Sequence, residues 1–82
     1  MARSTELLPE TDSLGGRLLH LREEKELTRR ALAFCLKCHE SSVTEWESGR
    51  HTPGIGVIIA YSDFFGVSTD WILKWERHGR KT

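Results

Sequence analysis

The sequence lacks an excess of either charge. Its 82 residues include 12 lysines and arginines and 12 aspartates and glutamates, so the formal net charge is zero. It also lacks a long hydrophobic run: the longest mainly apolar stretch, residues 55–61, is far shorter than the roughly 20 residues of a membrane span. The N-terminus carries acidic side chains and no apolar segment long enough for a secretory signal. We therefore expect a cytoplasmic protein with no membrane partner.

Strand signals are missing as well. No segment alternates polar and apolar residues strongly enough to compete with a helical pattern. A chain of this length suffices for one compact domain with a modest core. We expect that domain to cover residues 13–76. Residues 1–12 are predicted to form a flexible N-terminal arm, and residues 77–82 a basic C-terminal tail.

Cysteine is scarce, and both cysteines stand in the string Cys-Leu-Lys-Cys-His at residues 35–39. The string matches the pattern of covalent haem attachment, but that chemistry requires export, for which no signal is present. A redox dithiol is expected beside a βαβ pattern, which is absent. A zinc site needs four ligands, and His39 with the distant His51 completes one only by chance. We favour two small buried residues, Cys35 and Cys38, at a helix end, with no metal and no cofactor.

Apolar residues at helical spacing predict five short helices. These helices are expected over residues 13–25, 29–36, 40–48, 54–65 and 69–76. Asp12 and Ser13 at the start of the first helix, Thr28 before the second and Ser68 before the fifth are residue types that cap helix N-termini. Gly49 is typical of the residue that follows a helix C-terminus. The predicted fold class is therefore all-α, a compact five-helix domain joined by tight turns.

The helical pattern also predicts which side chains are buried. Leu32, Cys35 and Leu36 share the inner face of helix 29–36, whereas Phe34 points elsewhere. Trp46 and Trp71 lie on inward faces and are expected in the core. Helix 54–65 is expected to bury a combination of Ile55, Ile58, Tyr61, Phe64 and Phe65.

Two short helices joined by the turn at residues 37–39 have the geometry of a helix-turn-helix motif, whose second helix enters the DNA major groove. Helix 40–48 has one face with Val43, Trp46 and Glu47. Its opposite face carries a polar stripe of short side chains: Ser41, Thr44, Glu45 and Ser48. Short hydrogen-bonding side chains are suited to approach base edges. An ordinary solvated helix face has the same pattern, so the stripe alone leaves both interpretations open.

Several segments, in order along the chain, resemble the Xre/Cro/phage-repressor helix-turn-helix family. They are residues 14–18 and 21–28, Leu32-Ala33, the string Val-Thr-Glu-Trp-Glu-Ser-Gly-Arg at 43–50 followed by Pro53, and residues 61–73. The resemblance covers Leu14 to Trp75. It implies a lambda-repressor-like fold in which helices 29–36 and 40–48 form the motif. It also implies that the chain binds double-stranded DNA.

The resemblance implies roles for individual residues. The positions that read bases are Glu40, Ser41, Thr44 and Glu45. The positions that contact phosphates are Arg29, Lys37, Arg50 and His51. Arg22 and Glu47 match a buried ion pair that joins helix 13–25 to helix 40–48 in many members. This chain departs from the family where Lys37 replaces a common glycine and where His39 replaces the usual hydroxyl cap.

The resulting hypothesis is a sequence-specific transcriptional regulator, a repressor that binds a two-fold operator as a homodimer. Recognition helices in successive major grooves place half-sites about 34 Å apart. Leu73 and Trp75 are candidates for the dimer contact, with Phe34 and Leu19 as lesser ones. No enzymatic activity and no small-molecule ligand are expected.

The alternative hypothesis is a protein-interaction module on the same scaffold, with an antirepressor or antitoxin-like role. The neutral net charge favours it, as do Glu40 and Glu45 on the polar face of helix 40–48. The cations Arg29 and Arg50 beside that face favour DNA.

Overall fold

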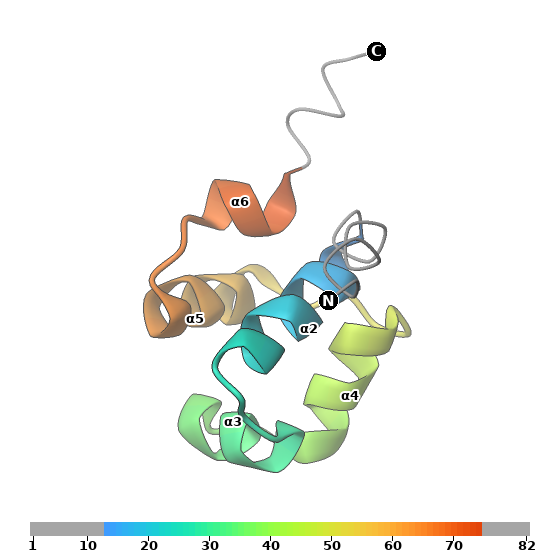
Figure 1. Ribbon diagram of the computed structural model, residues 1–82. Coiled ribbons are helices and arrows are strands. Elements are labelled where there is room, and N and C mark those ends of the chain that lie inside the picture. Colours follow the sequence, from blue (N-terminus) through green and yellow to red (C-terminus); the bar gives the residue numbers. More distant parts are fainter. Residues whose placement is uncertain (1–12, 75–82) are drawn as a thin grey trace, which may run out of the picture. The chain divides into compact units, whose positions relative to one another are not determined.

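A computed structural model describes residues 13–74 of the chain, and within that range every regular element is a helix. The order is α2 (Leu14–Glu24), α3 (Arg29–Leu36), α4 (Glu40–Ser48), α5 (Ile55–Phe65) and α6 (Thr69–Leu73) (Figure 1). The predicted all-α class is confirmed. None of these helices is long and apolar enough to cross a bilayer. The arm predicted at 1–12, the tail predicted at 77–82 and Trp75 lie outside the described residues.

Three of the predicted N-caps, Ser13, Thr28 and Ser68, begin helices in the structure, and Asp12 lies outside the described residues. The hydroxyl of Ser13 accepts a hydrogen bond from the backbone N–H of Gly16 at 2.9 Å. Thr28 caps α3 in the same way, and Ser68 caps α6, each with a bond of 3.0 Å. Each of these caps satisfies a backbone donor that the helix leaves unpaired, which contributes about 1 kcal/mol.

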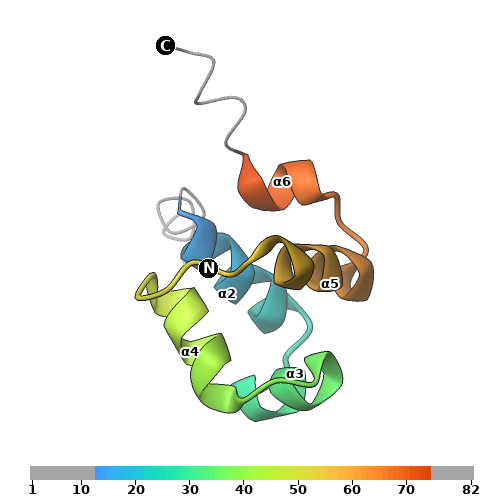
Figure 2. The same cartoon turned by 180° about the vertical axis from the view of Figure 1, so that it is seen from behind.

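The described residues form two units, 13–52 and 53–74. In the first unit, α4 contacts both α2 and α3, and Figures 1 and 2 show α4 following α3 through a short turn. The buried apolar side chains of this unit are Leu18, Leu21, Leu32, Ala33 and Val43. Their burial fixes which face of α4 points inward, and it thereby leaves the polar stripe on the outside.

The second unit contains α5 and α6. Of the five apolar residues considered for helix 54–65, Ile58, Tyr61 and Phe65 are buried, whereas Ile55 and Phe64 are exposed. The buried residues recur at i, i+3 and i+7, which is one face of a helix. The last helix ends at Leu73, earlier than the predicted Glu76, because Lys74 adopts a left-handed conformation with φ of 43°.

The burial predictions for four residues are wrong in whole or in part. Cys35 is exposed, because α3 buries the arc that contains Leu32 and Ala33, and Cys35 falls outside that arc. Trp46 and Trp71 are half-buried and do not belong to the fully buried core. Cys38 is half-buried, and both cysteines are free thiols. Among residues 13–74, no group of three or more His, Cys, Asp or Glu side chains is placed to hold a metal ion.

The two thiols are expected to differ in reactivity. Cys35 is exposed, whereas burial raises the pKa of the Cys38 thiol and lowers its thiolate fraction at neutral pH. We therefore expect iodoacetamide to alkylate Cys35 at least severalfold faster than Cys38. Mass spectrometry of a time course on the native protein measures both rates, with Cys35→Ser and Cys38→Ser as single-thiol controls. Equal rates in the folded protein, or faster alkylation of Cys38, contradict this expectation.

Candidate functional site

The turn between α3 and α4 is set by a left-handed residue. Lys37 adopts φ of 58° and ψ of 49° directly after α3. Its N–H donates to the carbonyl of Phe34 at 3.2 Å, and the N–H of Cys38 donates to the carbonyl of Ala33 at 3.0 Å. This pair of bonds is the Schellman motif, which satisfies two carbonyls at the end of α3. The chain then reverses, and α4 begins after His39, whose side chain makes no capping bond.

Replacing Lys37 with glycine is expected to raise the free energy of unfolding by about 1 kcal/mol. A left-handed side chain costs about 1–2 kcal/mol, and the larger unfolded-state entropy of glycine cancels part of the gain. Lys25→Gly is the matched control, because Lys25 follows α2 with φ of −93°. The control is expected to lower stability by about 0.5–1 kcal/mol. Urea denaturation measures both, and equal effects of the two substitutions contradict the prediction.

A charged network connects all three helices of the first unit. The guanidinium of Arg22 donates to both oxygens of Glu47, from Nε at 2.7 Å and from Nη2 at 3.1 Å. Its third nitrogen, Nη1, donates to the carbonyl of Leu27 at 2.7 Å. Arg29 Nε donates to Glu47 Oε1 at 3.0 Å. The Glu47 side chain is only 2% exposed, so both arginines converge on a buried carboxylate.

The network places Arg29 differently from what the sequence suggests. The family resemblance implies only a phosphate contact for Arg29, whereas in the structure its Nε is bound to Glu47. Its side chain is nevertheless 43% exposed, and an arginine bonded through Nε retains two terminal nitrogens as donors. The bond to Glu47 therefore fixes the side chain without using its whole donor capacity. No spacing rule in the sequence identifies this third member of the network.

The outer face of α4 is polar and accessible. Glu40, Ser41 and Thr44 are exposed, and the Glu45 side chain is 40% exposed. The Thr44 hydroxyl donates to the carbonyl of Glu40 at 3.2 Å. The Ser48 hydroxyl donates to the carbonyl of Glu45 at 3.1 Å. The four residues predicted to read bases thus come from one helix face that carries no large apolar side chain.

The loop after α4 folds back onto this face. The N–H of His51 donates to the carbonyl of Glu45 at 3.3 Å, and the imidazole Nδ1 lies 3.0 Å from Glu45 Oε1. The N–H of Arg50 donates to the Ser48 hydroxyl at 3.3 Å. Glu45 and His51 were predicted to contact different parts of a ligand, and the structure brings them together.

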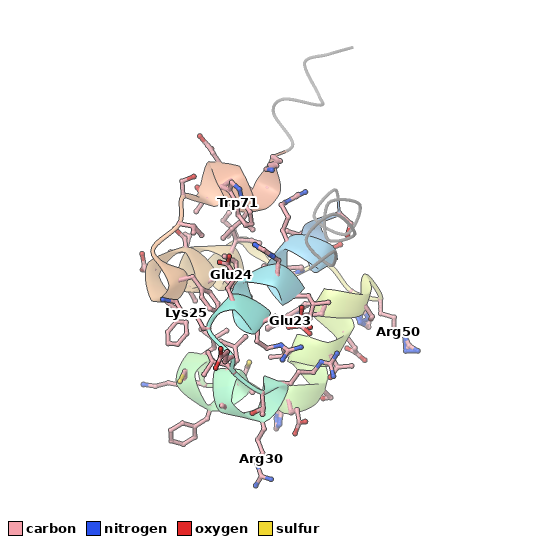
Figure 3. All side chains as sticks on the ribbon, in the orientation of Figure 1. Glu23, Glu24, Lys25, Arg30, Arg50 and Trp71 are labelled. Atoms are coloured by element: carbon pink, nitrogen blue, oxygen red, sulfur yellow. The ribbon has the colours of Figure 1, made fainter. Side chains whose placement is uncertain are left out.

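Exposed cations lie in the segments before and after α4. Lys37 and Arg50 are exposed in the turn before α4 and in the loop after it. Figure 3 shows that Arg30, from α3, and Arg50 both project away from the ribbon. Short hydrogen-bonding groups flanked by extended cations are the arrangement that contacts base edges and phosphates of a nucleic acid.

The comparison with protein families gives one match. A family model described as a helix-turn-helix domain matches residues 13–80 of the chain. No curated protein and no solved structure matches the sequence. The matched range includes α3, the left-handed turn at Lys37, and α4.

Proposed function

Because this chain belongs to the helix-turn-helix domain family, we propose that it is a sequence-specific transcriptional regulator that binds duplex DNA through α4. The main observation in support of the proposal is the outer face of α4. It is free of large apolar side chains, and it follows a turn whose geometry suits the motif. In this proposal α4 enters the major groove, and α3 supports it.

The proposed contacts divide into two classes. Base edges are read by Glu40, Ser41, Thr44 and Glu45. Phosphates are contacted by the cations at the ends of the motif, which are Arg29, Lys37, Arg50 and His51. Phosphate contacts fix the register and orientation of the protein, and base contacts select the sequence.

We propose further that the protein represses transcription as a homodimer, in the manner of the Xre/Cro family that the sequence resembles. A two-fold operator then has half-sites about 34 Å apart, or one helical turn. Repression by occluding polymerase needs no catalytic step and no cofactor.

A protein-interaction module is the second candidate, and two observations favour it. Carboxylates of Glu40 and Glu45 lie on the face that would meet DNA, where they repel phosphates. The side chain of Phe34 on α3 is 84% exposed, which suits an apolar contact with a partner protein.

The deciding experiment is selection from a random duplex DNA pool, followed by titration of the enriched sequence against salt. Enrichment of a two-fold motif, bound at nanomolar to tens of nanomolar concentrations with steep salt dependence, supports the DNA-binding repressor. An enriched motif without two-fold symmetry supports DNA reading and contradicts the dimer. Failure to enrich any sequence contradicts the proposal and favours the protein-interaction module.

Arg50→Ala is expected to weaken binding to all sequences alike. Loss of one phosphate contact per protomer reduces the magnitude of the slope of log affinity against log salt by about 0.9 for each bound protomer. Lys25→Ala is the matched control, because Lys25 is also an exposed cation and Figure 3 shows it on the opposite side of the first unit from Arg50. Fluorescence anisotropy at several salt concentrations measures the slopes. An unchanged slope in Arg50→Ala, or an equal change in both variants, shows that Arg50 does not contact the backbone.

A further inference from the structure

We propose that His51 is a specificity-determining residue, which holds the carboxylate of Glu45 so that it accepts a hydrogen bond from the amino group of a cytosine. This inference rests on the proposed function, since it requires that the outer face of α4 enters the major groove. It assigns His51 a positioning role, which replaces the phosphate contact given for it under the proposed function.

Two contacts hold Glu45 and His51 together. Nδ1 of His51 lies 3.0 Å from Glu45 Oε1, and the backbone N–H of His51 donates to the backbone carbonyl of Glu45 at 3.3 Å. An ionised carboxylate only accepts hydrogen bonds, so Nδ1 is the donor. The second contact fixes the backbone from which the imidazole extends. The loop therefore presents its donor to Glu45 from a defined position.

The pair is open to a ligand. The side chain of Glu45 is 40% exposed and that of His51 is 65% exposed. Glu45 Oε2 makes no hydrogen bond within residues 13–74, so it retains its capacity to accept one. A free glutamate loses rotamer freedom when it binds, and the bond to His51 has already restricted that freedom. The donor nitrogen of His51 also lies beside the negative charge of the Glu45 carboxylate. It therefore reduces the electrostatic repulsion between that carboxylate and the phosphates of DNA.

The neighbouring hydroxyls make this face rich in acceptors. Thr44 and Ser48 each have one hydroxyl hydrogen, and each donates it to a backbone carbonyl of α4. Both oxygens therefore offer only lone pairs to a ligand. In the major groove the donors are the amino groups of cytosine and adenine, and a carboxylate pairs with cytosine N4. The base facing Glu45 is thus expected to be cytosine.

The test measures base preference position by position. The best duplex selected by the wild-type protein is varied to all four bases at each position, and affinity is measured for the wild type, His51→Ala, His51→Asn, Glu45→Ala and His20→Ala. Asparagine places an amide donor near the position of Nδ1 and serves as the conservative variant. His20→Ala is the matched control, since His20 forms another His–Glu pair, with Glu24 on α2 at 3.4 Å. Thermal unfolding verifies that each variant is folded.

The wild type is expected to prefer cytosine at one position by about tenfold or more. His51→Ala and Glu45→Ala are expected to lose that preference at the same position and to keep the others. His51→Asn is expected to retain most of it, and His20→Ala all of it. An unchanged salt slope in His51→Ala supports positioning. A slope reduced in magnitude by about 0.9 for each bound protomer, with all base preferences intact, assigns His51 to a phosphate and overturns the inference.

Two further outcomes separate this inference from the proposed function. If the wild type enriches a motif and His51→Ala leaves every base preference unchanged, the inference is wrong and the DNA-binding function stands. If the wild type enriches no sequence, the proposed function fails, and the inference fails with it.

Discussion

Glu47→Ala is expected to lower the free energy of unfolding by about 3–5 kcal/mol, because it leaves a buried positive charge without its partner. Arg22 donates to both carboxylate oxygens, and the two side chains are 10% and 2% exposed. Without Glu47, Arg22 loses both of these hydrogen bonds and keeps the one to the carbonyl of Leu27. A loss of this size is a large fraction of the stability of a small domain, so part of the population is expected to be unfolded.

The matched control is Glu45→Ala, two residues earlier on the same helix. Glu45 also pairs with a basic side chain, but its pair with His51 is exposed. Exposed pairs contribute little, so this control is expected to change stability by less than about 1 kcal/mol. Urea denaturation followed by tryptophan fluorescence measures both variants. A loss below about 1 kcal/mol in Glu47→Ala shows that the carboxylate is not buried as the structure has it.

The double variant Arg22→Met/Glu47→Leu removes both charges of the buried pair, whereas Glu47→Ala leaves the charge of Arg22 behind. Comparing the two variants separates the contribution of the pair from the cost of leaving one buried charge. Replacing both members of a buried pair by apolar residues of similar volume is often neutral or stabilising. Arg29, with its side chain 43% exposed, can turn toward solvent when Glu47 is lost. We therefore expect the double variant to recover most of the stability that Glu47→Ala loses. If the double variant loses as much free energy of unfolding as Glu47→Ala, the hydrogen bonds of the network stabilise the fold by more than the desolvation of its charges costs.

The features that the sequence predicts well depend on local chemistry. Thr28 and Ser68 begin helices where expected, because a hydroxyl caps the N–H groups of the turn that directly follows it. Gly49 adopts a left-handed conformation at the end of α4, as expected of a residue that follows a helix C-terminus. The polar outer face of α4 was predicted for a similar reason, since the helical period places it on the side of α4 away from the buried Val43.

The features that the sequence does not predict depend on contacts between separate segments. The bond between His51 and Glu45 requires the loop after α4 to fold back, and the place of Arg29 depends on the packing of α3 against α4. Cys35 was misassigned because a helix as short as α3 leaves the direction of its buried arc ambiguous. Its neighbours alone do not determine which side of the helix meets the core.

Gly15 belongs to this second group, and it carries the other large expected effect. A Cβ at this position would lie 2.6 Å from the carbonyl oxygen of Glu47 and 2.7 Å from that of Trp46. Both contacts are with backbone, so no side-chain rotation relieves them. The start of α2 must move away from the end of α4 to make room. That shift also disturbs the 2.7 Å bond from Arg22 on α2 to Glu47 on α4.

Gly15→Ala is therefore expected to lower the free energy of unfolding by about 3 kcal/mol, the upper end of the usual cost of overpacking. Gly56→Ala is the matched control, because Gly56 is also helical and a Cβ there meets nothing within 4 Å. Alanine is the better helix former by about 0.5–1 kcal/mol, so the control is expected to stabilise by that amount. The same substitution then has opposite signs in α2 and α5, as measured by urea denaturation. Stabilisation in both variants contradicts the close approach of α2 to α4, and with it the way α2 holds the candidate recognition helix.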